Sequence, residues 1–66
     1  MEFIDYVLSF YGPGGIYDMN VKRDDVLLAT EIRLEYKKDI EFQGDSIDRE
    51  WVRDILIERF GYVGGV

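Results

Sequence analysis

No cysteine or histidine occurs among the 66 residues of this chain, so it must fold without the cross-links that stabilise many short proteins. This absence excludes disulfides and zinc sites built on thiolate or imidazole ligands. A chain of this length buries only about 60% of the surface that it exposes when unfolded. Its 47% of apolar residues is nevertheless too high for intrinsic disorder. We expect a single small domain over residues 1–66, which gains further burial by association.

Hydrophobic periodicity predicts three helices. The first covers residues 2–11, where a Gly-Pro pair follows as a stop signal. The second covers residues 22–38, with acids at its start and lysines at its end, as the helix dipole favours. The third is capped by Asp45 or Ser46 and closed by Gly61. The sequence therefore predicts an all-α fold, a compact three-helix domain.

An alternating pattern competes with the helical one. Residues 2–11 also alternate between apolar and polar, although the Gly-Pro ending favours a helix. Over residues 30–42, Ile32, Leu34 and Tyr36 alternate with charged neighbours, which is typical of a half-buried strand. The alternative fold is therefore α+β, with a small sheet or hairpin over residues 30–42. Helix-forming residues dominate this segment and no glycine or proline interrupts it, so the helix is favoured.

Each predicted helix has an apolar face that we expect to be buried. The expected core residues are Phe3, Ile4, Val7, Leu8, Phe10 and Tyr11 in the first helix, Val21, Leu28, Ala29, Ile32 and Tyr36 in the second, and Ile47, Trp51, Val52, Ile55, Leu56 and Phe60 in the third. Large apolar and aromatic residues exceed what one small core can enclose. Those that lie off the main faces form the candidate interface: Tyr6, Leu27, Leu34 and Ile57.

The two glycine-rich segments differ in character. Residues 12–20 contain three glycines and a proline, but Ile16, Tyr17 and Met19 are too apolar for a free linker. We expect these three side chains to hold the loop against the core. Residues 62–66 are apolar and glycine-rich, and they predict a flexible C-terminal tail.

The segment from Asp39 to Glu50 has the length of a calcium-binding loop, with Gly44 where such loops require glycine. The side chains at its third and fifth positions, Glu41 and Gln43, are longer than those that such loops use. A turn at Gly44 followed by a helix cap is therefore the favoured interpretation. We expect neither a metal ion nor any other cofactor.

Catalysis is not expected either. Acidic residues adjoin at Asp24 and Asp25 and share a helix face at Asp54 and Glu58, but a chain with 14 acids forms such pairs by chance. Hydroxyl nucleophiles have no histidine to activate them. The sequence predicts that the protein is not an enzyme.

Net charge limits the classes of partner. A charge of −6 and a pI near 4.4 argue against direct contact with nucleic acid, which requires a basic face. No apolar run is long enough to span a membrane, and no signal peptide is recognisable. We therefore expect no membrane contact and a cytoplasmic location.

These observations predict a small acidic interaction or regulatory module that forms a homodimer and binds a protein partner through exposed aromatic and aliphatic residues. The alternative is an acidic inhibitor that imitates nucleic acid and occupies a DNA- or RNA-binding protein. Short acidic reading frames of that kind suit viruses and mobile elements. Salt separates the two hypotheses, because screening weakens binding by charge while apolar contacts persist.

Overall fold

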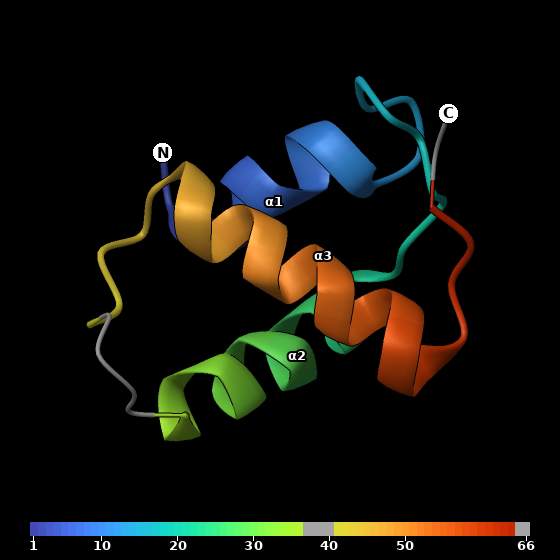
Figure 1. The fold of residues 1–66 in the computed structure, drawn as a ribbon. Helices are drawn as coiled ribbons and strands as arrows, with labels where there is room; N and C mark the ends of the chain where they lie inside the picture. The colour runs from blue at the N-terminus through green and yellow to red at the C-terminus, as the bar shows by residue number, and fades with distance from the viewer. Residues whose placement is uncertain (37–40, 65–66) are drawn as a thin grey trace.

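The structure is a computed structural model that describes residues 1–36 and 41–64. It contains three helices, α1 (Phe3–Tyr11), α2 (Arg23–Glu35) and α3 (Ser46–Phe60). α3 lies across α2, and both of these helices contact α1 (Figure 1). The all-α prediction is confirmed, and the described residues contain no strand. The alternative with a sheet or hairpin is therefore wrong for the described part of residues 30–42.

The helix ends follow the local sequence signals closely at α3 and less closely at α2. The Asp45 carboxylate caps α3 by accepting the N–H groups of Ile47 at 3.0 Å and Asp48 at 3.4 Å. Gly61 ends the helix in the left-handed conformation, with φ of 78°. α2 stops at Glu35 although the prediction extended it to residue 38, and residues 37–40 lie outside the described part of the chain.

The core is formed by apolar residues from all three helices and from the loop after α1. Its buried members are Val7, Tyr11, Met19, Val21, Val26, Ala29, Val52, Ile55 and Leu56. All of these except Val26 were predicted to contact the core. Partly buried residues that pack against them include the predicted Phe3, Ile4, Leu8, Phe10, Ile32, Trp51 and Phe60.

Three residues predicted to be buried are exposed. Leu28 is 50% exposed, Tyr36 is 39% exposed and Ile47 is 52% exposed. Leu28 lies on the outer side of α2 because Val26, Ala29, Thr30 and Arg33 face the core. Tyr36 follows the last helical residue, and its φ and ψ of −83° and 83° turn it off the helix face. Ile47 stands in the first turn of α3, where its neighbour Asp48 is the residue that turns inward.

The loop after α1 is held by backbone hydrogen bonds and by two of its side chains. Met19 is buried as predicted, and the Tyr17 ring, although 46% exposed, stacks on the buried Tyr11 with ring centroids 6.2 Å apart. Ile16 is 68% exposed, so the prediction is wrong for that residue. The Tyr11 carbonyl accepts the N–H groups of Met19 at 3.0 Å and Val21 at 3.2 Å. These bonds, together with the Met19 and Tyr17 side chains, turn the chain back onto the core.

Tyr62, the first residue of the predicted flexible tail, lies against the start of α2. Its hydroxyl accepts the N–H of Lys22 at 3.2 Å and donates to the Asp25 carboxylate. Burial, followed by the hydrogen bond to Asp25, raises the pKa of Tyr62, and the Lys22 N–H opposes this shift. Flexibility of residues 62–66 stays a prediction, and residues 65–66 lie outside the described part.

Candidate functional site

The inner face of α2 carries an arginine where an amphipathic helix normally carries a large apolar residue. This face consists of Val26, Ala29, Thr30 and Arg33, which recur at helical spacing and are all buried. Arg33 is 1% exposed, as is Asp48 of α3. The Nε and Nη2 atoms of Arg33 each lie 2.9 Å from Oδ1 of Asp48.

The environment of this ion pair satisfies both charges. The second carboxylate oxygen of Asp48 accepts the N–H groups of Gln43 at 2.7 Å and Gly44 at 2.8 Å. The Arg33 guanidinium lies 4.0 Å from the ring centroid of Trp51. No buried side-chain nitrogen or oxygen among the described residues lacks a hydrogen-bond partner. The Arg33–Asp48 pair therefore joins α2, the loop before α3 and α3 itself, and it offers nothing to a ligand.

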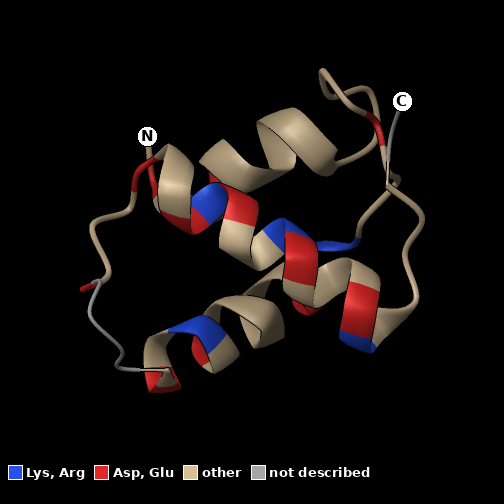
Figure 2. Cartoon of the chain, in the orientation of Figure 1, with Lys and Arg blue, Asp and Glu red and all other residues tan. Residues whose placement is uncertain are grey.

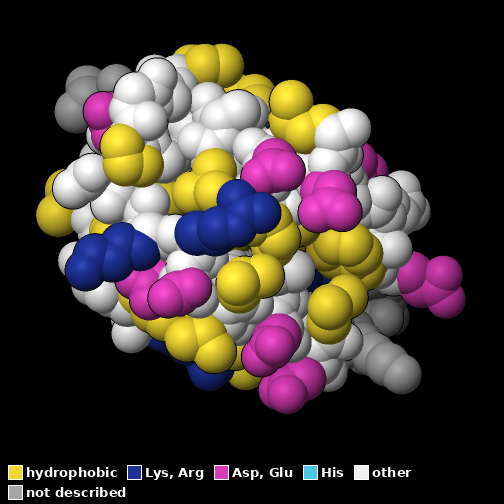
Figure 3. All heavy atoms as spheres, turned by 180° about the vertical axis from the view of Figure 1, so that it is seen from behind, with side chains coloured by type: hydrophobic (Ala, Val, Ile, Leu, Met, Phe, Trp, Pro, Cys, Tyr) yellow, Lys and Arg dark blue, Asp and Glu magenta, His cyan; other side chains and the backbone are white. Residues whose placement is uncertain are grey.

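The outer face of α2 exposes leucines among charged residues. We define it by its exposed residues, which are Arg23, Asp24, Leu27, Leu28, Glu31, Leu34 and Glu35. Leu27 is 43% exposed, Leu28 is 50% exposed and Leu34 is 47% exposed. From behind, the molecule shows hydrophobic side chains interspersed with acidic and basic ones (Figure 3). The helix thus buries an arginine and exposes three leucines.

A second candidate site is a groove beside α3. It has a volume of about 520 Å³. The groove runs between the loop after α1, α3 and the start of the C-terminal tail, and is lined by Tyr11, Tyr17, Met19, Arg49, Glu50, Arg53, Asp54, Ile57 and Gly64.

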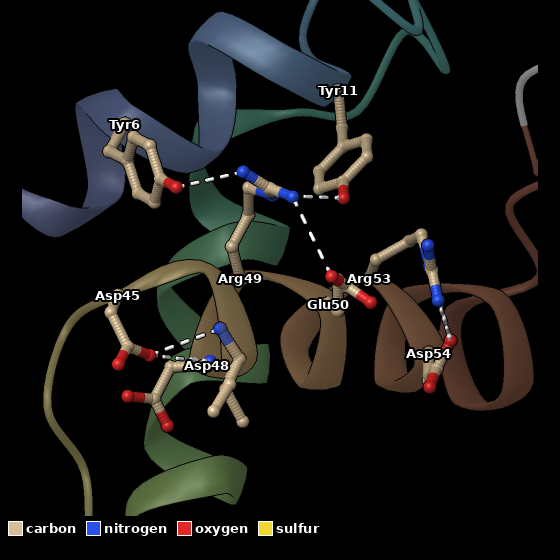
Figure 4. A network of polar contacts seen from close by, with 9 residues as sticks. Tyr6, Tyr11, Asp45, Asp48, Arg49, Glu50, Arg53 and Asp54 are labelled. Atoms are coloured by element: carbon tan, nitrogen blue, oxygen red, sulfur yellow. Dashed lines mark hydrogen bonds and ion pairs between the residues drawn. The ribbon is translucent and has the colours of Figure 1, made fainter.

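Arg49 forms the wall of this groove that faces α1. It points from α3 to two tyrosines of α1 (Figure 4). Its Nη1 donates to the Tyr6 hydroxyl at 2.8 Å, and its Nε donates to the Tyr11 hydroxyl at 3.3 Å. Its guanidinium also lies 4.0 Å from the ring centroid of Phe10. Burial acts to lower the pKa of Arg49, but the hydrogen bonds and charge interactions with both tyrosines outweigh it, so the pKa is raised.

The charges that line the groove balance one another. Arg53 donates from Nε and Nη2 to Oδ1 of Asp54, at 3.2 and 3.0 Å, and this hydrogen bond raises the pKa of Arg53. Glu50 lies 3.7 Å from Nη2 of Arg49. Basic and acidic residues are mixed along the whole of α3 (Figure 2). Two arginines and two carboxylates therefore favour neither an anionic nor a cationic ligand in this groove.

The four candidate interface residues do not form one surface. Leu27 and Leu34 share the outer face of α2, seven residues apart. Tyr6 is partly buried and its hydroxyl is bound by Arg49, so it belongs to the contact between α1 and α3. Ile57 is partly buried and lines the groove. Only the two leucines remain together as candidates.

The predicted turn and helix cap before α3 are confirmed. Gly44 adopts a φ of 69°, and Asp45 caps the helix. Asp39, the first position of the hypothetical calcium loop, lies outside the described residues. Within residues 1–36 and 41–64, no group of three or more His, Cys, Asp or Glu side chains is placed to hold a metal ion.

Two further findings concern the chain as a whole. Among the described residues, none of the helices has the length and apolar character needed to cross a membrane. Neither a protein-family model, nor a curated protein, nor a solved structure matches this chain.

Proposed function

We propose that this protein is a small interaction module that binds protein partners, including a second copy of itself, through the outer face of α2. The observation that carries the proposal is the exposure of Leu27, Leu28 and Leu34 on a helix whose inner face buries Arg33. Exposed apolar side chains that gather on one face of a small protein commonly mark interaction sites.

The energetics of a short chain support this choice of surface. Each Å² of apolar surface removed from water contributes roughly 25 cal/mol. A 66-residue chain without disulfides has little stability to spare, yet three leucines on α2 are about half exposed. Contact with a partner would bury them and recover that contribution.

Self-association through this face would be twofold, because the same patch then meets itself. A net charge of −6 on each copy opposes the pairing, and salt screens this repulsion more than it weakens apolar contact. The proposed role is binding without catalysis, since the sequence has neither histidine nor cysteine. We also propose a cytoplasmic location, because small secreted domains usually rely on disulfides.

Sedimentation velocity at tens of micromolar protein tests the proposal. We expect an average mass above the 7.8 kDa of one chain, and an increase of that mass when salt is raised to about 0.5 M. Leu34→Asp should return the protein to the monomer mass. Ile16→Asp is the matched control, because Ile16 is an exposed apolar residue in the loop after α1 and should leave association unchanged.

Two results would contradict the proposal. One is a single 7.8 kDa species for the unchanged protein at every salt concentration. The other is equal loss of association in Leu34→Asp and Ile16→Asp. The nucleic-acid-mimic alternative predicts a different outcome, in which a basic protein partner is bound at low salt and released at about 0.5 M salt.

A further inference from the structure

The outer face of α2 carries a line of carboxylates as well as leucines. Asp24, Glu31 and Glu35 are all exposed and are separated by seven and four residues, which places them on one side of the helix. Leu27 and Leu34 border this acidic line, with Glu31 one helical turn from each of them. Any partner that covers the leucines must therefore also come close to the carboxylates.

The exposed basic side chain of α2, Arg23, is already paired with a carboxylate of α1. The helix contains two arginines, Arg23 and Arg33. Nη1 of Arg23 lies 2.8 Å from Oδ1 of Asp5 in α1. Arg33 is buried against Asp48 on the opposite face. The outer face therefore combines apolar contact area with a net negative charge, since it carries three carboxylates and a single arginine that is already paired with Asp5.

We infer that the partner best suited to this face is a basic amphipathic helix of another protein, with apolar side chains that contact the leucines and Lys or Arg residues that meet the carboxylates. This inference rests on the proposed function, since it takes the outer face of α2 to be an interaction surface. A helix of this kind is a common ligand of apolar helical surfaces.

Charge distinguishes this partner from a second copy. A second copy brings three more carboxylates to the interface, and the repulsion between like charges disfavours this self-association. A basic helix replaces that repulsion by attraction and gains from the chain's net charge of −6 during approach. Self-association is then the weaker of the two interactions and is displaced by the basic helix.

Two synthetic peptides as long as α2, which has 13 residues, test this inference. Both carry leucines at the same helical spacing, and their remaining positions are lysine in one and glutamate in the other. Binding is followed by backbone amide chemical shifts of the full chain. We expect the leucine–lysine peptide to bind and to shift the α2 resonances, and the leucine–glutamate peptide to bind at least tenfold more weakly.

Matched charge variants locate the contact. Glu31→Gln with Glu35→Gln removes two charges from the outer face of α2, and Glu50→Gln with Glu58→Gln removes two exposed charges from α3. The α2 variant should raise the dissociation constant of the leucine–lysine peptide about fivefold at low salt. The α3 variant should change it by less than about twofold, since its charges lie outside the contact.

The outcomes separate the inference from the proposed function. Equal effects of the two charge variants, equal binding of both peptides, or shifts confined to the groove residues would overturn the basic-helix inference. If neither peptide binds α2 but the chain self-associates and Leu34→Asp abolishes this, the inference is overturned and the proposed function stands. If neither peptide binds and the chain stays monomeric, both fail.

Discussion

The inner and outer faces of the 13-residue helix α2 each depart from an ordinary amphipathic pattern, the inner face by one buried charge and the outer face by three exposed leucines. The inner face buries Arg33 to 1% exposure, whereas the outer face leaves Leu28 50% exposed. Hydropathy alone would assign these positions the other way round. The difference shows that this helix buries a charged side chain where packing partners are available to it, beside Val26 and Ala29, whose burial hydropathy explains.

The inner face supplies such partners for a charged group. The Arg33 guanidinium contacts the Asp48 carboxylate and the Trp51 ring. Two backbone N–H groups donate to the same carboxylate. The remaining inner residues, Val26, Ala29 and Thr30, are small or β-branched and are buried with Arg33. The outer face has no such set of partners within the described chain, and its leucines stay available to a second molecule.

Breaking the ion pair of the inner face should have the largest effect on stability. Asp48→Ala leaves the buried Arg33 charge without its counter-ion, and we expect a loss of about 3–5 kcal/mol in the free energy of unfolding. A loss of that size unfolds much of a domain this small. Urea titration followed by circular dichroism measures it.

Two variants sharpen this test. Asp54→Ala breaks the exposed pair with Arg53 and should cost less than about 1 kcal/mol. Replacing both members of the buried pair, with Arg33→Met and Asp48→Leu, should cost clearly less than Asp48→Ala alone, because no charge remains buried. Equal losses in Asp48→Ala and Asp54→Ala would show that Arg33 does not depend on a buried partner.

Removing the ring that covers the same arginine should have the next largest effect. Trp51 is partly buried, packs against the core and lies 4.0 Å from the Arg33 guanidinium. We expect Trp51→Ala to cost about 3 kcal/mol, the lower end of the range for a buried tryptophan. Trp51→Phe keeps a ring and should cost less. A loss below about 1 kcal/mol in Trp51→Ala would show that the Trp51 ring does not stabilise the packing around Arg33.

A smaller effect is expected where the tail meets the first turn of α2. Tyr62→Phe removes the hydroxyl that bonds Lys22 and Asp25, and should cost about 1 kcal/mol at neutral pH. Tyr17→Phe, at a half-exposed tyrosine, should cost less than about 0.5 kcal/mol. Thermal unfolding of the two variants compares them.

The raised pKa of Tyr62 adds a pH dependence to this contact. Because folding favours the protonated phenol, the stability that it contributes is present below the ordinary tyrosine pKa of about 10. It is lost as the pH rises through the higher pKa of the folded state. The unchanged protein should therefore lose more stability than Tyr62→Phe between neutral pH and the alkaline range. Identical losses would exclude Tyr62 as the group responsible.

Most of the fold could be predicted from sequence because its signals are local. Asp45 and Gly61 mark the two ends of α3, and apolar spacing identified most of the core. The inner face of α2 could not be predicted in this way, because Arg33 is buried only through Asp48, fifteen residues away. The regular spacing of Val26 and Arg33 was present, but hydropathy argued against an arginine on a core face.

The candidate site was predicted in part. Leu27 and Leu34 were identified because they lie off the expected core face, and the structure leaves both exposed. Leu28 was missed because the core face predicted for this helix included it. Tyr6 and Ile57 were grouped with the leucines by the same rule, but the positions of α1 and α3 relative to α2 depend on tertiary packing, which helical spacing does not contain.

The outer leucines are assigned to association and not to the fold, and the unfolding midpoint at a series of protein concentrations tests this assignment directly. The midpoint of the unchanged chain should rise with concentration, as mass action requires when folding and association are linked. Leu27→Ser with Leu34→Ser should abolish that rise and leave the midpoint at high dilution unchanged, within about 0.5 kcal/mol of stability. A midpoint independent of concentration in the unchanged chain, or a large loss of stability in the variant at high dilution, would contradict the assignment.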